Sequence, residues 1–203
     1  APNLNNNAPG AAYIYKLNGT WAFSETLSAS DATTRNYFGA HVKLNESRII
    51  VAASHNIGAI YNYEFGGNNW LETQKIIPLD PPTNAFGSAM DAELNTLVVG
   101  AKFDNSVATQ GGAAYTYQWD TNNGWVRTHE LFAPNPTDYE KFGNTVSLSG
   151  NSLLITAQED QAYLFKNYNN GWQSSKVLIP MEDVSQDKFG VSGAITADTI
   201  FVG

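Results

Sequence analysis

The side chains that most often carry catalysis are few in this chain and form no recognisable catalytic or metal-binding pattern. The three histidines, His41, His55 and His129, fall at unrelated points of the sequence and none has the His-Glu-x-x-His spacing of a zinc site. A Gly-x-Ser-x-Gly nucleophile elbow and a phosphate-binding glycine loop are both missing. The chain has no cysteine, which excludes disulfides and cysteine-ligated metals.

Carboxylates are the remaining candidates for chemistry, because two acids facing each other across a cleft can hydrolyse a glycosidic bond. Five aspartates stand in polar segments of loop-like composition: Asp31, Asp80, Asp138, Asp183 and Asp187. Aspartates in such segments also serve simply to keep a loop solvated, and we favour that interpretation. We therefore predict no catalytic residue, and keep a hydrolase or an enzyme accessory domain using these loop carboxylates as an alternative.

Residues in the same kind of segment could instead hold a ligand. Tyr37 and Tyr139 stand beside Phe-Gly pairs, where an aromatic ring could stack on a sugar or anchor its own loop. Asp104 and Asn105 belong to a polar stretch, and Asp183 follows another acid in a second one. We predict that these five residues contribute to ligand binding.

The elements that must position these loops come from a four-fold repeat. Phe-Gly pairs stand at positions 38, 86, 142 and 189, so the repeats are 47 to 56 residues long. An aliphatic residue closes an apolar run thirteen residues after each Phe, and a Trp precedes each Phe by sixteen or seventeen residues. Repeats of this length are typical of propeller blades or arrays.

One repeat contains four short strands separated by turns. In the third unit we expect strands over residues 142–148, 153–157, 162–165 and 172–179. Four antiparallel strands in about fifty residues make one propeller blade. The glycine after each Phe predicts a positive φ or a close backbone approach. The residue two before each Phe is expected to accept bonds from nearby backbone N–H groups: Asn36, Asn84, Glu140 and Asp187.

Aromatic residues two apart on the third strand share one face of the sheet. Tyr13, Tyr15 and Leu17 form such a set, and the next repeat has Tyr61, Tyr63 and Phe65 at the same positions. We expect both sets, together with Trp119 at the level of Phe65, to pack one blade on the next.

We therefore predict an all-β chain with a single β-propeller domain over residues 1–203, built from four blade-equivalents of four antiparallel strands each. Two arrangements remain open. Either the last two strands pair with the first two and close a four-bladed ring, or the chain is a segment of a larger propeller. The segment would leave sheet edges exposed at both ends, and self-association is then expected.

Composition limits the partners. The net charge is −8 and the eleven basic residues are scattered singly, so we expect neither nucleic acid nor an anionic membrane as a partner. No apolar run approaches eighteen residues, so we expect no membrane insertion. Charged residues make up only 15% and Asn, Gly, Ser and Thr are abundant, a composition common in secreted β proteins.

These features together resemble the FG-GAP repeat family, which includes the integrin α-subunit propeller and related bacterial and fungal propellers. The resemblance covers essentially the whole chain. It is carried by the four Phe-Gly pairs, by Val99-Gly100-Ala101, by the run from Gly10 to Tyr15, and by the Trp that opens the fourth strand. The family implies a propeller ring of about seven blades.

The calcium loop of integrin-like members is missing. That loop, Asp-x-Asp-x-Asp-Gly, joins the first two strands, and the corresponding segments here are 44–48, 92–96, 149–152 and 196–199. None has the three carboxylates that a hard cation prefers. The resemblance is therefore to the short-loop bacterial and fungal type, and we predict no cofactor and no metal. Asn18 and Asn45 begin sequons for N-glycosylation.

The resemblance implies a non-catalytic extracellular or cell-surface module that binds a protein partner through its propeller loops. The alternative is a lectin with carbohydrate sites between blades, since some fungal propellers resembling this family bind sugars there. In either case the blades serve as a scaffold and the loops carry the function.

Overall fold

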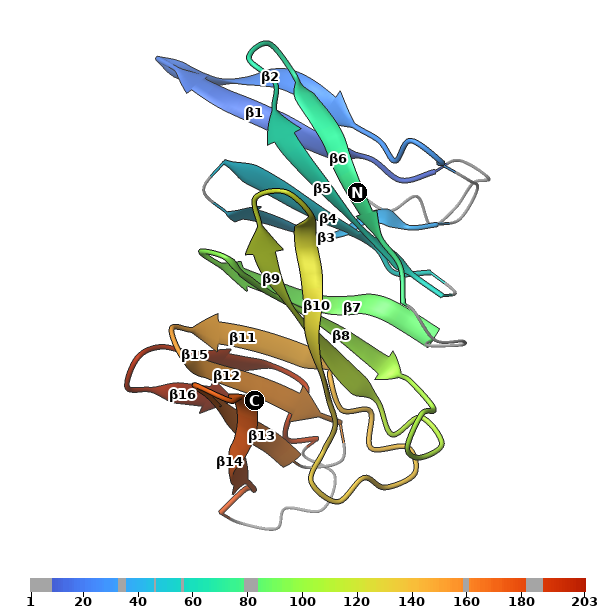
Figure 1. Cartoon of the computed structure of the whole chain (residues 1–203), viewed down its shortest axis with the longest axis vertical. Helices are drawn as coiled ribbons and strands as arrows, with labels where there is room; N and C mark the ends of the chain where they lie inside the picture. The colour runs from blue at the N-terminus through green and yellow to red at the C-terminus, as the bar shows by residue number, and fades with distance from the viewer. Residues whose placement is uncertain are drawn as a thin grey trace.

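The computed structural model describes residues 9–32, 36–45, 47–55, 57–78, 84–158, 161–181 and 188–203, and every regular element within them is a β-strand (Figure 1). The strands are β1 (Ala12–Asn18), β2 (Thr20–Leu27), β3 (Phe38–Asn45), β4 (Arg48–Ala53), β5 (Ala59–Phe65), β6 (Trp70–Ile76), β7 (Asn84–Glu93), β8 (Thr96–Phe103), β9 (Ala113–Asp120), β10 (Gly124–Leu131), β11 (Thr145–Ser149), β12 (Ser152–Ala157), β13 (Gln161–Tyr168), β14 (Gly171–Leu178), β15 (Gly193–Ile195) and β16 (Ile200–Val202). The part of the chain that the structure describes contains no helix that could cross a membrane.

The strands form three complete blades and two half-blades. Blade 1 is β3–β6, blade 2 is β7–β10 and blade 3 is β11–β14, each an antiparallel sheet whose strands pair in chain order. The N-terminal half-blade is β1–β2 and the C-terminal half-blade is β15–β16. The N-terminal half-blade corresponds to the third and fourth strands of a complete blade. The C-terminal half-blade corresponds to the first and second strands. The predicted all-β architecture of four-stranded propeller blades is confirmed.

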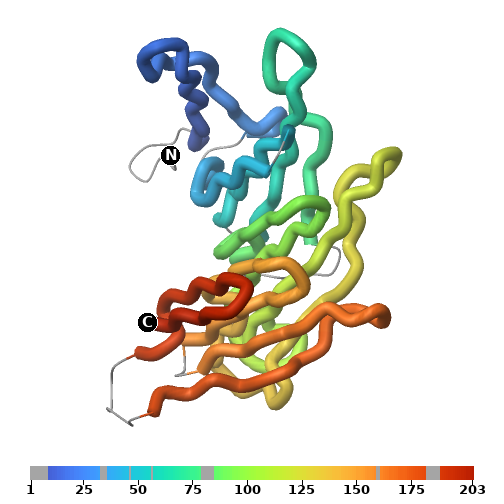
Figure 2. The backbone as a smooth tube through the Cα atoms, turned by 90° about the vertical axis from the view of Figure 1, so that its left-hand side faces the viewer, coloured from blue at the N-terminus to red at the C-terminus, as the bar shows by residue number. Residues whose placement is uncertain are grey.

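The blades are stacked along the long axis of the molecule without closing into a ring. The N-terminal half-blade lies near the top and the C-terminal half-blade in the lower half of both views (Figures 1 and 2). They form two separate two-stranded sheets. Of the two arrangements that the sequence left open, the structure therefore has the open one.

In the complete blades, the Phe-Gly pair forms a bulge where the chain enters the first strand. The pairing of β3 with β4 skips from Phe38 to His41, and that of β7 with β8 skips from Phe86 to Ala89. The four glycines have φ values of 86°, 85°, 85° and 95°, as predicted. In blade 3 the same bulge delays the strand: Gly143 and Asn144 both donate to the Thr156 carbonyl at 3.1 Å. Our prediction that this strand begins at residue 142 was therefore wrong, and β11 begins at Thr145.

The phenylalanine of each complete blade is fully buried against a tyrosine of the third strand of the same sheet. The ring centroids are 5.4 Å apart for Phe38 and Tyr61, and 5.6 Å apart for Phe86 and Tyr115. In blade 3 the same pair, Phe142 and Tyr163, has a separation of 5.3 Å. The hydroxyl groups of these tyrosines extend beyond the apolar core into the neighbouring loops, where they are hydrogen-bonded.

Successive blades meet through backbone as well as through side chains. The Phe86 amide donates to the Ile57 carbonyl at 3.2 Å, and the Phe142 amide donates to the Gly111 carbonyl at 2.9 Å. The glycines that precede the third strands, Gly58 and Gly112, lie against the carbonyls of these phenylalanines, and a Cβ atom on either would overlap the carbonyl oxygen. The pitch from one blade to the next is therefore set by a backbone contact that only glycine permits.

Aromatic packing between blades follows the prediction for Tyr61 and Tyr63 but not for the other members of the two sets, and Phe65 is 45% exposed. Tyr61 and Tyr63 are 2% and 3% exposed and pack against the N-terminal half-blade. Tyr13, Tyr15 and Leu17 are 55%, 57% and 62% exposed, so the prediction that they pack between blades is wrong for this arrangement. The reason is geometric: their face of the sheet points away from blade 1, and no further described blade covers it.

Polar contacts join the first strands of neighbouring blades. The Asn45 side-chain amide donates to the Leu94 carbonyl at 2.6 Å. The Leu148 amide donates to the Asp91 carboxylate at 2.8 Å, and the Ile195 amide donates to the Ser147 hydroxyl at 3.2 Å. The last two bonds join equivalent positions of successive repeats, and each sets how far one inner strand is displaced along the next.

The glycine contact between blades gives a direct test. Gly112 and Gly19 both have a positive φ, 83° and 75°, but an added Cβ meets backbone at Gly112 and nothing within 4 Å at Gly19. Replacing either by Ala brings the left-handed strain of about 1–2 kcal/mol. We expect Gly112→Ala to lower the free energy of unfolding by about 1–3 kcal/mol more, because the two blades must separate. Urea unfolding followed by tryptophan fluorescence measures both losses, and equal losses would contradict the proposed contact.

Candidate functional site

Four of the five predicted ligand-binding residues are described, and these four lie at one end of the blades. In an antiparallel blade, the connection between the second and third strands and the connection to the next blade emerge at the same end. We call this end the loop face; its described segments are residues 28–32, 36–37, 54–55, 57–58, 77–78, 104–112, 132–144 and 179–181. Tyr37, Asp104, Asn105 and Tyr139 lie on it, whereas Asp183 lies outside the described residues.

Asp104 is buried beneath the loop face instead of projecting from it. The residue is 1% exposed, and its carboxylate accepts hydrogen bonds from the Ser106 amide at 2.7 Å and the Tyr115 hydroxyl at 3.0 Å. The neighbouring Asn105 is exposed, but its side chain accepts a bond from the Gln110 amide and donates one to the Phe103 carbonyl. Both side chains therefore shape the loop over 104–112, and their predicted role in ligand binding stays a prediction.

Tyr139 projects from the second large loop, residues 132–144, which lies alongside the first. Its side chain is 54% exposed, while its amide donates to the Thr109 carbonyl at 2.6 Å. Two further bonds join these loops: Lys141 to the Gln110 carbonyl at 3.0 Å, and Thr109 to the Asp138 carboxylate at 2.8 Å. Tyr139 is thus an exposed aromatic ring on a backbone that is held at several points.

Tyr37 and His55 form a smaller aromatic contact at the loop face of blade 1. Their ring centroids are 4.5 Å apart and the rings are tilted by 46°. Tyr37 is half-buried and its φ is 57°, a value that non-glycine residues seldom adopt. The aromatic contact is consistent with an anchoring role for this ring within its own loop.

A tyrosine–carboxylate pair lies under the loop face of every complete blade, and nothing in the repeat pattern indicated it directly. The pairs are Tyr61 with Asp31, Tyr115 with Asp104, and Tyr163 with Glu140. Burial raises the pKa of each tyrosine, and its carboxylate partner raises it further. The tyrosines occupy one repeat position, but the three acids come from unrelated positions in the loops, which is why the repeat pattern did not reveal them.

Two lysines gather where the loop face meets the inner strands of blades 2 and 3. Lys102 donates to the Asn144 side chain at 3.3 Å, and Lys141 donates to the Gln158 side chain at 3.0 Å. Gln158 in turn donates to the Asn144 oxygen at 3.2 Å. Burial lowers the pKa of Lys102, and the positive charge of Lys141 lowers it further. Among the described residues, neither ammonium group forms an ion pair with a carboxylate.

A polar pocket of about 260 Å³ lies between blades 1 and 2, at the end of the blades opposite the loop face. Glu64, Thr73 and Gln74 line it from blade 1, and the β9–β10 hairpin contributes Trp119 and Asn122. Trp119 packs edge-on against Trp125, with centroids 5.3 Å apart, and the Arg48 guanidinium covers one of its faces at 3.9 Å. The prediction that Trp119 fills space between blades agrees with these contacts.

The described loop carboxylates are bonded to groups of the chain itself, and Asp31 accepts hydrogen bonds from the Tyr61 hydroxyl at 2.8 Å and from Lys75. Glu140 is 1% exposed and bonded to Tyr163 and to the Thr137 amide, and Asp138 is bonded to the Thr109 amide. Within the described residues, no three His, Cys, Asp or Glu side chains are grouped so that they could hold a metal ion. Asp80, Asp183 and Asp187 lie outside that part of the chain.

The two glycosylation sequons lie in different environments. Asn18 is exposed at the tight hairpin between β1 and β2. Asn45 is 6% exposed, and its side-chain nitrogen, which would carry a glycan, donates to the Leu94 carbonyl of the next blade. Of the two predicted positions, only Asn18 presents its side chain to solvent in the folded chain.

Comparison with known families gives one match. Residues 70–117 match the family model described as FG-GAP repeat. The segment begins at the first residue of β6 in blade 1, contains Phe86-Gly87 and ends within β9 in blade 2, so it spans one junction between blades. The resemblance to FG-GAP repeats is confirmed for this segment. No curated protein matches the chain.

The buried tyrosines predict a characteristic alkaline transition. Because burial raises the pKa of Tyr61, Tyr63, Tyr115, Tyr117 and Tyr163 above the ordinary value of 10.0, the folded state favours their neutral form. This contribution to stability is complete below pH 10 and is lost as the pH rises above it. We expect the five to ionise only as the chain unfolds, measured by tyrosinate absorbance alongside circular dichroism. In Tyr115→Phe the late step should shrink by one tyrosine; ionisation of all tyrosines near pH 10 in folded protein would contradict the burial argument.

Proposed function

We propose that this chain, which carries an FG-GAP repeat at residues 70–117, is a non-catalytic extracellular module that binds a protein partner through the loop face of its blades. The observation that carries the proposal is the structure of loops 104–112 and 132–144. Backbone hydrogen bonds join them, and they present Tyr139 to solvent. A surface that is already ordered loses little conformational entropy on binding, and exposed tyrosines on such surfaces are frequent interface anchors.

Charge supports a partner with an acidic group. The chain carries a net charge of −8, yet Lys102 and Lys141 lie close enough for the positive charge of Lys141 to lower the pKa of Lys102, and both ammonium groups donate to amide oxygens. A carboxylate of a partner would relieve the repulsion between the two ammonium groups and gain charge-assisted hydrogen bonds. We therefore propose that the contact centres on Tyr139 and extends toward these lysines, without a metal ion.

Two tyrosines of equal exposure test this proposal. Tyr139 on the loop face and Tyr168 on the β13–β14 hairpin, at the opposite end of blade 3, are both 54% exposed. Wild type, Tyr139→Ala and Tyr168→Ala are used in parallel to retrieve partners from an extracellular fraction, and the purified partner is then titrated against each. We expect Tyr139→Ala to weaken binding about tenfold or more, as an interface aromatic does, with little change for Tyr168→Ala. Equal effects would overturn binding through the loop face.

A lectin is the second candidate, favoured by the pocket between blades 1 and 2. An indole ring beside Glu64, Thr73 and Asn122 offers the apolar and hydrogen-bonding groups that a sugar requires. A glycan array with the purified chain, with and without a calcium chelator, tests this candidate. If the lectin is correct, a free sugar competes, Asn122→Ala abolishes the signal and Tyr139→Ala leaves it unchanged. Loss of binding with the chelator would overturn our proposal that no metal is needed, and a negative array from folded protein would exclude the sugars on it.

A further inference from the structure

We propose that Lys102 and Lys141 together bind one carboxylate side chain of the partner protein, an Asp or a Glu that lies between neutral or apolar residues. The inference rests on the protein-binding function proposed for the loop face, and it names the chemical group that this face recognises. The two lysines are then the residues that determine specificity, and Tyr139, on the same loop as Lys141, is the aromatic anchor.

A network of side-chain amides holds both ammonium groups where blade 2 meets blade 3. The Lys102 ammonium donates to the Asn144 oxygen at 3.3 Å, and the Lys141 ammonium donates to the Gln158 oxygen at 3.0 Å. The Gln158 nitrogen donates to the same Asn144 oxygen at 3.2 Å, so one network joins the two lysines. Asn144 is 8% exposed, and its nitrogen donates to the Gly190 carbonyl at 3.2 Å, which fixes the network to the last repeat.

Within the described residues, Lys102 and Lys141 donate to neutral amide oxygens, whereas Lys43 is paired with the Asp91 carboxylate at 2.5 Å. An ammonium group has three N–H donors, and the bond to the amide uses one of them. Burial lowers the pKa of Lys102, and the positive charge of Lys141 lowers it further. A carboxylate with one oxygen on each lysine would offset this repulsion and form charge-assisted hydrogen bonds.

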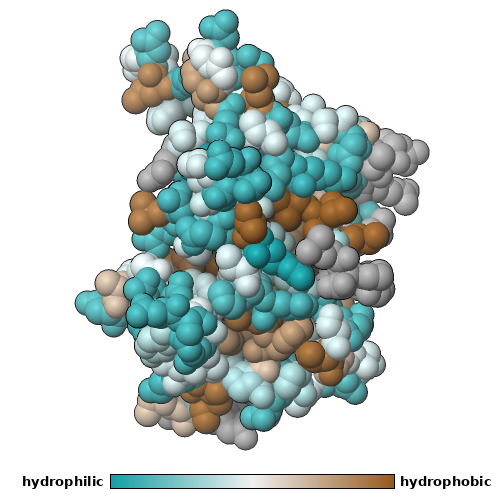
Figure 3. All heavy atoms as spheres, viewed as in Figure 1, coloured by the Kyte–Doolittle hydropathy of each residue, from teal (hydrophilic) through white to brown (hydrophobic). Residues whose placement is uncertain are grey.

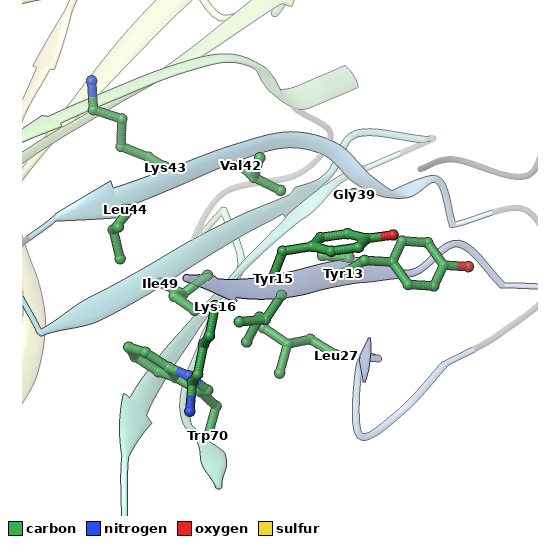
Figure 4. Close-up of a pocket in the computed structure, with 12 residues that line it drawn as sticks. Tyr13, Tyr15, Lys16, Leu27, Gly39, Val42, Lys43, Leu44, Ile49 and Trp70 are labelled. Carbon is green, nitrogen blue, oxygen red and sulfur yellow. The ribbon is translucent and has the colours of Figure 1, made fainter. Parts of the chain in front are cut away.

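Two lysines that line the apolar groove between β1 and β3 are arranged differently. The groove has a volume of about 500 Å³, and the side chains of Lys16 and Lys43 extend from it in opposite directions (Figure 4). The Lys16 ammonium lies 5.0 Å from the centre of the Phe65 ring, and Lys43 forms the ion pair with Asp91. These two lysines therefore do not form a joint site for an anion, as the pair at the loop face does.

The charge of the chain and the surroundings of the lysines indicate what accompanies the carboxylate. A net charge of −8 repels a polyanion, so a single acid among uncharged residues approaches the site at a lower electrostatic cost. The joined loops expose Tyr139 and Val107 to 54% and 46%, which provides apolar contacts on the same surface. On the face seen in Figure 3, hydrophobic residues are dispersed among hydrophilic ones, and a short segment that combines an acid with apolar residues matches such a surface.

Two peptides that differ only in the carboxylate test the site without any partner protein. Acetyl-Leu-Glu-Leu-amide and acetyl-Leu-Gln-Leu-amide are titrated into isotope-labelled chain, and the lysine ammonium signals are followed by NMR. We expect the Glu peptide to shift the signals of Lys102 and Lys141 saturably, and the Gln peptide to bind about tenfold more weakly. Equal binding of the two peptides, or no saturable shift in folded protein, would overturn the proposal. So would tighter binding of inorganic phosphate than of the Glu peptide, because the site would then take anions in general.

Lysine variants assign the binding to particular residues. Lys102→Gln and Lys141→Gln each remove one charge but keep a polar side chain, and the matched control is Lys166→Gln. Lys166 also donates to a neutral oxygen, that of the Ser152 hydroxyl, but it lies at the opposite end of blade 3. We expect each of the first two variants to weaken binding of the Glu peptide about tenfold, and the control to leave it unchanged. Because Lys141 belongs to a loop, Lys141→Gln still tests the site if Lys102→Gln fails to fold. An equal loss in the control contradicts the assignment.

The same variants separate this inference from the function on which it rests. If a retrieved partner protein loses affinity for Tyr139→Ala but binds Lys102→Gln and Lys141→Gln like the wild type, the loop face is an interface and the carboxylate site is wrong. If the Glu peptide binds through both lysines but no retrieved partner responds to Tyr139→Ala, the carboxylate site is supported and the proposed contact of Tyr139 is wrong.

Discussion

The contact between the Phe-Gly phenylalanine and the tyrosine of the third strand is the interaction on which the rest of the structure depends. It joins the first and third strands of one sheet across the second, and it places the tyrosine hydroxyl among the loops, where a carboxylate receives it. The glycine beside the phenylalanine lets the main chain turn with φ near 85°, which brings the next blade into backbone contact. The packing of the core, the spacing between blades and the shape of the loops therefore all depend on the Phe-Gly pair and the tyrosine that it contacts.

This arrangement explains how the loops of blades 2 and 3 are attached to their sheets. Under blades 2 and 3 a buried acid binds both a tyrosine that belongs to the rigid sheet and backbone amides of its own loop, whereas Asp31, the acid of blade 1, is exposed. The loop is therefore attached to the sheet through hydrogen bonds to a desolvated carboxylate, which are stronger than neutral ones. The calcium loop of integrin-like repeats is a different one, between the first two strands. A buried acid under the loop face and a calcium loop therefore do not exclude each other.

The repeat pattern predicted what depends on local chemistry and missed what depends on the neighbouring blade. Phe-Gly spacing, turn residues and strand periodicity gave the blades and the positive φ of the glycines. The burial of Asp104, predicted as a ligand residue, could not be foreseen, because its partner Tyr115 is reached only after the loop folds back over eleven residues. The exposure of Tyr13 was missed for a related reason: a repeat predicts which face is apolar, but not whether another blade covers it.

Among the described residues, the contacts of each blade run to the blades before and after it, and that has a consequence for how order is distributed along the chain. Cooperativity between such units passes through nearest-neighbour junctions alone, so the terminal units, held on one side, open at the lowest free energy. Blade 2 has a complete blade on both sides. Amide hydrogens should thus exchange earliest at the half-blades and last in β8, which places the most persistent part of the molecule directly beneath the loop that carries Asp104.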